Sequence, residues 1–193
     1  MKTRLSPNPS HFRRTHADID LRRIQYNFHA FEKIFPAGTF LCPMVKANAY
    51  GHGDTEVAQA LRLAGCAAIG VALVEEGEKI RRAGDRDPIL VFGPVDSVAA
   101  EAAIRESLTV VASDWSHLEA LETAANRLGA SAVKIHFEFN TGMNRLGFPV
   151  KEASRLEKWI RAHREFLLDG ICTHLLRGND AGEPGGESER QLR

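Results

Sequence analysis

The sequence predicts an α/β fold in which parallel strands alternate with helices. Short apolar runs recur along the chain and are separated by helical patterns of about ten residues, which is typical of βαβ units. The chain has 193 residues, of which 44% are hydrophobic and 26% charged, so it can bury a core. Two arrangements fit: a doubly wound sheet, which can stop at six strands, and a TIM barrel, which needs eight strands and typically ~250 residues. Periodicity alone does not choose between them.

We expect six strands, each an apolar run bounded by turn-forming residues. They cover residues 39–45, 67–72, 88–92, 108–112, 133–139 and 166–175. The first ends at Lys46, and the last runs into a glycine-rich loop, GNDAGEPGGESE. The polar, proline- and arginine-rich start of the chain predicts a flexible N-terminal tail at residues 1–14 and one domain at residues 15–193.

A helix is expected after each of the first five strands. These helices cover residues 54–64, 73–83, 97–106, 113–128 and 150–163. Asp54 can cap the first of them and Ser113 with Asp114 the fourth, because their side chains accept hydrogen bonds from the free N–H groups of a first turn. Gly84 can end the second helix, since glycine adopts the left-handed conformation without steric cost.

Charge and cysteine content exclude several function classes. Lysine plus arginine and aspartate plus glutamate number 25 each, so the neutral chain lacks the basic footprint of a nucleic-acid or membrane binder. No apolar stretch approaches the ~20 residues that span a bilayer, and the basic N-terminus lacks the apolar core of a secretory signal. Cys42, Cys66 and Cys172 lie far apart, which predicts free thiols, no metal site and a cytoplasmic protein.

Lys46 is the first candidate for chemistry. It follows the apolar run FLCPMV, and the carboxyl end of a buried strand is where α/β enzymes place functional side chains. Partial burial there would favour the neutral amine, a nucleophile that can form a Schiff base with an aldehyde. Position alone favours the other interpretation, a lysine that reaches out to solvent.

The residues around Lys46 reverse that balance. Residues 45–53, VKANAYGHG, resemble without a mismatch the cofactor-attachment motif of alanine racemases, which use pyridoxal 5'-phosphate (PLP). The resemblance implies that Lys46 holds PLP and is one of two racemisation bases, and that Tyr50 contacts the cofactor phosphate. Gly51 and Gly53 would let the turn pass close to the strand ends.

Two further segments resemble the same family. Residues 139–148, FNTGMNRLGF, resemble its DTGM-x-RLGF stretch, whose arginine, here Arg145, hydrogen-bonds the phenolic oxygen of PLP. Arginine suits this role because it stays charged and has a planar array of donors. Residues 169–174, DGICTH, resemble the segment whose histidine, here His174, lies against the cofactor ring. Without their flanks, the two would read as a loop arginine and a satisfied core histidine.

Three positions or segments depart from the family. Asn140 replaces the usual aspartate, which removes a negative charge near Arg145. Glu138 stands where many members have a lysine that is carbamylated in several of them. It either supplies the same negative charge permanently or is a solvent-facing strand residue. Because Lys134, His136 and Glu138 alternate, they share one face of the strand. The loop after His174, LLRGND, also differs from the usual FAxAD.

The resemblance covers about residues 15–193 and implies a (β/α)8 TIM-type barrel, truncated after about six βα units. It implies a PLP-dependent isomerase that interconverts L- and D-alanine for cell-wall peptidoglycan and forms a homodimer at full length. The family's second base and the arginine facing the pyridine nitrogen have no counterpart here, so we expect an N-terminal fragment that is inactive alone. Two alternatives stay open: a non-catalytic PLP-binding barrel protein, whose lysine motif differs, and an inert product with an unclosed barrel.

Overall fold

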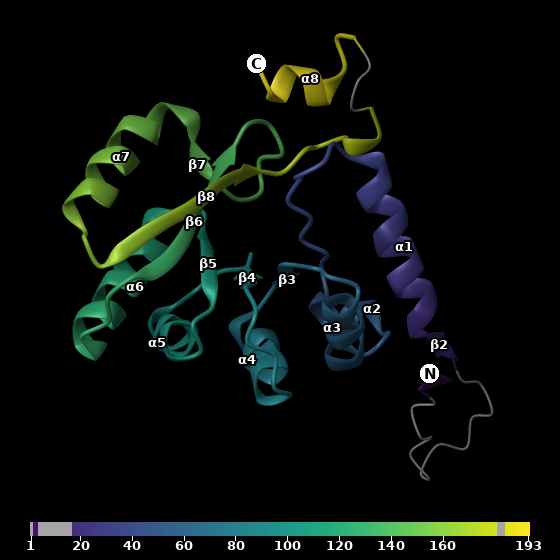
Figure 1. The fold of residues 1–193 in the computed structure, drawn as a ribbon. Helices are drawn as coiled ribbons and strands as arrows, with labels where there is room; N and C mark the ends of the chain where they lie inside the picture. Colours follow the sequence, from purple (N-terminus) through teal and green to yellow (C-terminus); the bar gives the residue numbers. More distant parts are fainter. Residues whose placement is uncertain (1, 4–16, 181–183) are drawn as a thin grey trace, which may run out of the picture.

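The computed structural model describes residues 2–3, 17–180 and 184–193. The tail predicted at residues 1–14 lies outside the described residues, apart from β1 (Lys2–Thr3), which pairs antiparallel with β2 (Ile19–Asp20). The rest of the described chain is organised around one parallel sheet with helices along its outer side (Figure 1).

The strands of this sheet follow one another in chain order. They are β3 (Ile69–Val71), β4 (Ile89–Val91), β5 (Thr109–Ala112), β6 (Val133–Asn140) and β8 (Phe166–Thr173), all parallel. The two-residue β7 (Phe148–Pro149) pairs with the end of β6, on the side opposite β8. A doubly wound sheet reverses its strand order at a switch point, whereas a barrel adds each strand beside the previous one. The sequential order therefore confirms the barrel and excludes the doubly wound sheet.

Five helices back the sheet and confirm the predicted helices with slightly shorter ends. They are α3 (Asp54–Leu63), α4 (Val74–Arg82), α5 (Ser97–Arg105), α6 (Trp115–Leu128) and α7 (Ala153–Ala162). The last is entered through the 3₁₀ turn η1 (Val150–Glu152). Asp114 caps α6 as predicted, accepting the N–H groups of Ser116 and His117. Gly84, at φ 101°, follows the end of α4.

The predicted cap at Asp54 is wrong. Gly53 precedes the helix, and Asp54 is its first helical residue. The carboxylate of Asp54 is buried and lies 2.6 Å from Lys79 Nζ. The backbone N–H of Asp54 donates to Asn48 Oδ1 at 3.2 Å. The side chain of Asn48, in the preceding turn, therefore satisfies one of the free N–H groups at the start of the helix.

The strand predicted at residues 39–45 is also wrong in extent. Only Met44 forms a parallel bridge, to Gly70 of β3. Val45 N–H donates to Gly70 O at 2.8 Å, and Gly70 N–H to Pro43 O at 2.9 Å. Continuing this ladder toward the N-terminus needs an N–H at Pro43, and proline has none. Ala68 O, the carbonyl left over, accepts from Cys66 Sγ at 2.9 Å.

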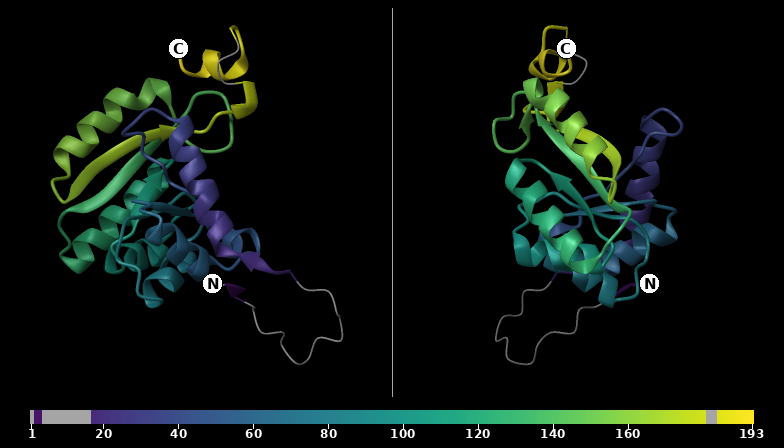
Figure 2. Two further views of the ribbon diagram at one scale, coloured as in Figure 1. Left: turned by 45° about the vertical axis from the view of Figure 1, so that its right-hand side comes forward. Right: turned by 90° about the vertical axis from the view of Figure 1, so that its left-hand side faces the viewer.

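Helix α1 (Leu21–Ile34) was not predicted. Its N-cap is Asp20, whose carboxylate accepts the N–H of Arg22. Its buried Phe28 points into the core, and Gln25 Nε2 donates to Ala60 O on α3 at 3.0 Å. The helix lies at the end of the arc opposite α7 in Figure 1, and in the right-hand view of Figure 2 α7 faces the viewer while α1 lies behind. At the carboxyl side, η2 (Gly178–Asp180) and α8 (Glu187–Gln191) close the described chain.

The alternation of the strands separates two hydrophobic clusters. Ile69, Ile89 and Val110 point to the helices and belong to the main core. The smaller cluster lies on the other strand face and contains Ala68, Leu90 and Val111, with Cys42, Phe92 and Cys172 against it. The three cysteines are free thiols, as predicted, and Cys66 is the buried one. Among the described residues, no helix combines the length and apolar character that crossing a membrane requires.

Candidate functional site

The four residues singled out by the sequence all lie at or beyond the carboxyl ends of the parallel segments. Lys46 and Tyr50 bound the helical turn α2 (Lys46–Tyr50), directly after the Met44 bridge to β3. Arg145 lies in the loop after β6, and His174 follows the last residue of β8. Carboxyl ends of parallel strands meet at one edge of the sheet, which is where barrels carry functional side chains. Lys46 begins α2 rather than ending a strand, which corrects its predicted position.

The turn after Lys46 is left-handed. Residues 47–50 have φ values of 51°, 57°, 51° and 54°, and glycine follows at φ 88°. Outside glycine this conformation costs roughly 1–2 kcal/mol per residue, because Cβ crowds the following carbonyl oxygen. A run of four such residues is therefore kept by its surroundings rather than by local preference, and strain of this kind is often found at functional sites.

Glu76 on α4 holds the strained turn. Its Oε1 accepts the N–H of Ala47 at 2.6 Å, and its Oε2 accepts the N–H groups of Ala72 and Leu73 at 2.8 and 3.1 Å. One carboxylate therefore joins the turn to the end of β3 and to the start of α4. The VKANAYGHG motif gives no sign of this contact, because Glu76 lies 29 residues beyond Ala47.

Lys46 and Tyr50 lie close together. The Lys46 Nζ is 5.9 Å from the centre of the Tyr50 ring, within the range of a cation–π contact. Lys46 is partly buried, whereas Tyr50 is exposed. The pair thus combines a partly buried lysine with an exposed tyrosine at the same edge of the sheet.

Arg145 is associated with an acidic side chain on the inner face of β6. Glu138 is only 7% exposed, which excludes the solvent-facing interpretation of this residue. Burial raises the pKa of Glu138, and the nearby Arg145 guanidinium opposes that rise. Cys172 is the register partner of Glu138 on β8, and burial raises the pKa of its thiol to about 11, with a further contribution from the Glu138 charge.

Asn140 shapes the loop that carries Arg145. Its Oδ1 accepts the N–H groups of Gly142 and Asn144 at 3.1 and 3.0 Å. Its Nδ2 donates to Asn144 Oδ1 at 3.1 Å. The donated bond needs an amide, so at this position asparagine provides a contact that the family's usual aspartate lacks when ionised.

Gln191 of α8 links the loop of Arg145 to that of His174. Its Nε2 donates to Thr141 Oγ1 and to His174 O, both at 3.2 Å, and its Oε1 accepts the N–H of Leu176 at 2.8 Å. Thr141 is further joined to Thr173 through their hydroxyls at 2.8 Å. His174 itself is exposed. Sequence reasoning missed Gln191 because its partners lie up to 50 residues away.

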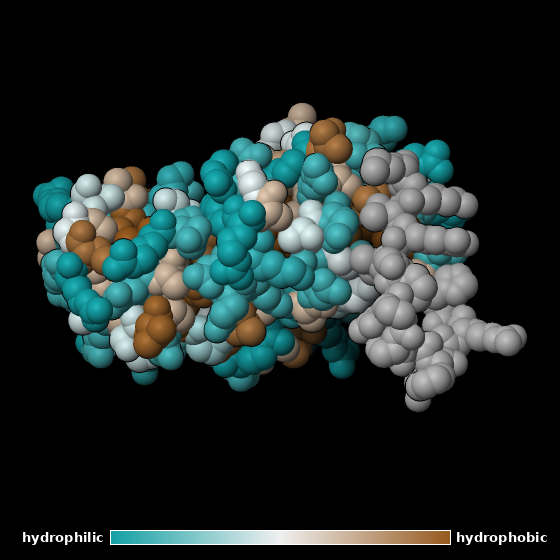
Figure 3. All heavy atoms as spheres, turned by 90° about the horizontal axis from the view of Figure 1, so that it is seen from below, coloured by the Kyte–Doolittle hydropathy of each residue, from teal (hydrophilic) through white to brown (hydrophobic). Residues whose placement is uncertain are grey.

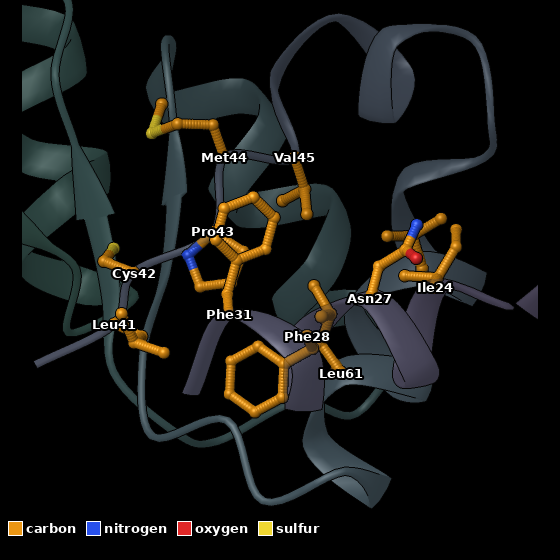
Figure 4. A pocket seen from close by; sticks show the side chains of 11 residues that line it. Ile24, Asn27, Phe28, Phe31, Leu41, Cys42, Pro43, Met44, Val45 and Leu61 are labelled. Atoms are coloured by element: carbon orange, nitrogen blue, oxygen red, sulfur yellow. The ribbon is translucent and has the colours of Figure 1, made fainter. Parts of the chain in front are cut away.

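The structure therefore arranges the four residues as two pairs. Lys46 contacts Tyr50, while the loops of Arg145 and His174 are joined through Gln191. Within the described ranges, no hydrogen bond or ion pair links one pair to the other. A cavity of about 350 Å³ lies beside the Lys46 segment, between α1 and residues 41–45 (Figure 4). Its lining, which includes Phe28, Phe31 and Leu41, holds no charged side chain, so it does not suit a phosphorylated ligand.

An arc of sequential parallel strands, backed by helices and carrying a strained lysine turn at its carboxyl edge, defines a domain of the (β/α)-barrel class. Residues 19–193 match the family described as alanine racemase, N-terminal domain. The chain therefore belongs to the alanine racemase N-terminal domain family.

Curated relatives and solved structures agree with this family. The chain is 38% identical over 172 residues to an alanine racemase of Symbiobacterium thermophilum, covering 89% of this chain and 45% of the relative. It is also 38% identical to alanine racemase 1 of Bacillus subtilis, covering 88% of this chain and 43% of that protein. An alanine racemase structure from Streptomyces lavendulae superposes with a TM-score of 0.82 at 28% identity, covering 90% of this chain and 45% of that one. The chain thus spans less than half the length of these relatives.

Proposed function

We propose that this chain supplies the N-terminal barrel part of a PLP-dependent alanine racemase, an isomerase that interconverts L- and D-alanine. The supporting observation is that the family match includes the VKANAYGHG turn, which carries Lys46 at the carboxyl edge of the sheet. The curated relatives named alanine racemase support the same substrate. In this proposal the complete enzyme is a cytoplasmic homodimer that provides D-alanine for the cell wall.

The residues at the carboxyl edge fit PLP by the chemistry of their donors. Lys46, a partly buried residue, offers its amine for the cofactor aldehyde, and Arg145 offers a charged donor whose guanidinium lies near Glu138. We assign Tyr50 to the cofactor phosphate and His174 to the face of the ring. When bound, PLP would supply an electron sink for the charge left when the α-proton departs. Lys46 Nζ would then accept or return that proton, as one of two bases.

Covalent labelling tests the assignment of Lys46. The chain is incubated with PLP, reduced with borohydride and digested, and the labelled peptide is identified by mass spectrometry. We expect one dominant adduct on Lys46, lost in Lys46→Ala and kept in Lys158→Ala, which removes an exposed lysine of α7. Label spread evenly over many lysines would show that no specific site exists.

Racemisation by the 193-residue chain alone should be negligible. The reaction needs a proton removed on one face and delivered on the other, and only Lys46 is matched as a base. A missing general acid–base group typically lowers the rate by ~10²–10⁴-fold. The assay follows conversion of L-alanine to D-alanine with saturating PLP, in the chain and in Lys46→Ala. Fast turnover that depends on Lys46 would contradict this expectation, since it would mean that a second base is present.

A further inference from the structure

A second cavity, of about 620 Å³, lies at the end of the sheet away from Lys46. It is lined by the carboxyl ends of α4 and α5 and by the first residues of β5 and β6. The lining residues are Arg81, Arg82, Arg86, Pro88, Arg105, Glu106, Ser107, Thr109 and Lys134. Its volume lies within the range of small-molecule sites, roughly 300–1,000 Å³. In a barrel this amino-terminal end does not carry the catalytic residues, so the cavity is separate from the proposed racemase site.

One lining cation has a structural role. Arg81 is 6% exposed, and its guanidinium donates to the carbonyl oxygens of Asp87, Glu106 and Ser107. It also forms an ion pair with Asp85 at 3.2 Å. Arg81 therefore builds the wall of the cavity by joining the loops after α4 and α5, and its charge is already compensated.

The remaining cations are only weakly compensated. Arg82 lies 3.8 Å from Glu78 on the exposed surface of α4. Arg105 lies 3.9 Å from Glu101, whose other oxygen is held by Arg127 at 2.7 Å. Exposed pairs at such distances are worth little, typically below about 1 kcal/mol, so these guanidinium groups remain available to a better acceptor.

Arg86 and Lys134 complete the positive lining. Arg86 donates to two carbonyl oxygens, those of Arg81 and Asp85. Within the part of the chain that the structure describes, no carboxylate oxygen lies within 4.0 Å of its guanidinium. Lys134 has an exposed carboxylate partner, Asp169, at 3.3 Å. Apart from Arg81, three arginines and a lysine thus line one cavity in a chain whose net charge is zero.

The carboxylates that pair with these cations, on Glu78, Glu101 and Asp169, lie outside the lining. Glu106 is the only acidic residue in the described lining. The carboxyl ends of α4 and α5 each add roughly half a negative charge, which explains part of the arginine enrichment in these last turns. Within the lining itself, the four cations other than Arg81 outweigh Glu106 and the two helix ends together. Arginine forks match phosphate oxygens, and Ser107 and Thr109 add hydroxyl groups to the lining.

We propose that this cavity binds a small phosphorylated ligand, a phosphate monoester or diphosphate carrying at least two negative charges. The site needs neither PLP nor the racemase reaction. Binding would join the ends of α4 and α5 to the start of β6, and these elements lie at the opposite end of the sheet from Lys46.

Isothermal titration calorimetry of the 193-residue chain with inorganic pyrophosphate, at low ionic strength, tests this site. We expect saturable binding of one pyrophosphate, tighter than that of inorganic phosphate, because two phosphate groups engage more of the cations. Arg82→Ala and Arg105→Ala should each weaken binding by roughly tenfold, as loss of a charge-assisted hydrogen bond predicts. Arg161→Ala is the matched control. It removes an exposed arginine of α7 that pairs with Glu157, and should leave binding unchanged.

Three results would overturn the proposal. These are an absence of saturable binding, equal weakening in all three arginine variants, or tighter binding of a short DNA duplex with the same dependence on Arg82 and Arg105. Far-ultraviolet circular dichroism of each variant verifies that it is folded. Lys46→Ala should bind pyrophosphate normally, so failure of the racemase assignment and failure of this site are distinguishable.

Discussion

Residues of the Lys46 turn are held in the left-handed conformation, which is unfavourable for a residue with a Cβ atom. Ala47 lies at φ 51° and ψ 49°, where an alanine is strained by roughly 1–2 kcal/mol and a glycine is not. Glycine also loses more freedom on folding, by roughly 0.5–1 kcal/mol. Ala47→Gly should therefore raise the free energy of unfolding slightly, by up to about 1 kcal/mol. Urea denaturation followed by circular dichroism measures this.

The matched substitution at the same position is Ala47→Val. A β-branched side chain is a clear outlier at positive φ, so the free energy of unfolding should fall by more than about 1 kcal/mol. Equal effects of glycine and valine would show that the turn is not left-handed in solution. A less stable glycine variant would show that the freedom glycine loses on folding outweighs the strain it relieves.

Glu138 gives stability a pH dependence whose sign follows from its burial. Burial raises the pKa of this carboxyl above 4.5, so the folded state prefers the neutral form. The unfolded chain loses the proton first as pH rises, and stability is lost between pH 4.5 and the raised folded pKa. Glu138→Gln cannot ionise and escapes this loss. Its free energy of unfolding, relative to wild type, should increase with pH across that window and stay constant above it.

Urea denaturation of both proteins between about pH 4 and pH 8 measures the effect. Glu157→Gln, at an exposed position of α7, is the control and should not show the same increase. A gap between Glu138→Gln and wild type that closes as pH rises would contradict the prediction. It would mean that Arg145 stabilises the charged carboxylate more than burial penalises it.

The residues of the site divide into those that a local motif can predict and those that it cannot. Lys46 and Tyr50 belong to nine consecutive residues, and Arg145 and His174 to short contiguous segments, so a sequence pattern can single them out. Their roles toward PLP stay predictions. Glu76 and Gln191 act across 29 and 50 residues of chain, through contacts that exist only after folding. No periodicity or spacing announces such contacts.

At the scale of elements, the sequence predicts whatever is set by apolar periodicity. The strands β3, β4, β5, β6 and β8 and the helices between them were expected from their apolar runs and helical patterns, whereas the two-residue β7 was not. The first strand was predicted too long. Pro43 ends it because the ladder to β3 would need an N–H at this residue, and that need is known only once the pairing with β3 is known. Helix α1 was missed although Leu21, Ile24 and Phe28 have helical spacing.

The junction between β3 and β4 depends on a close backbone approach. A Cβ at Gly93, which follows β4, would lie 2.1 Å from the carbonyl oxygen of Ala72. Backbone atoms of two packed strands cannot move aside cheaply, so Gly93→Ala should lower the free energy of unfolding by at least about 2 kcal/mol. Gly178→Ala is the control, because a Cβ there meets nothing within 4 Å and needs no positive φ. Thermal denaturation that shifts equally in both variants would refute this account of the junction.

At the scale of the whole molecule, the described sheet is an arc with two edges. β8 pairs with β6 on one side, and no other described strand pairs with it. Leu167, Leu168 and Ile171 of this strand are each more than two-fifths exposed. Hydrophilic residues cover most of the face seen in Figure 3, where hydrophobic residues are separate from one another. On β8, by contrast, the exposed hydrophobic residues lie on one strand that also has free backbone groups. Exposed apolar side chains and an unpaired strand edge together promote association.

This edge predicts how the 193-residue chain behaves at rising concentration. We expect concentration-dependent self-association through β8, because its unpaired N–H and C=O groups can pair with a second chain while Ile171 and its neighbours leave water. Ile171 is 68% exposed, so Ile171→Lys should change the stability of the fold little, and its charge should reduce the association constant roughly tenfold or more. Sedimentation velocity over a roughly hundredfold range of concentration measures this.

Leu63→Lys is the control, since Leu63 is 78% exposed but lies on α3, away from any strand edge. Association that weakens equally in both variants would show that added charge matters and the edge does not. Association unaffected by either would place the contact elsewhere on the molecule.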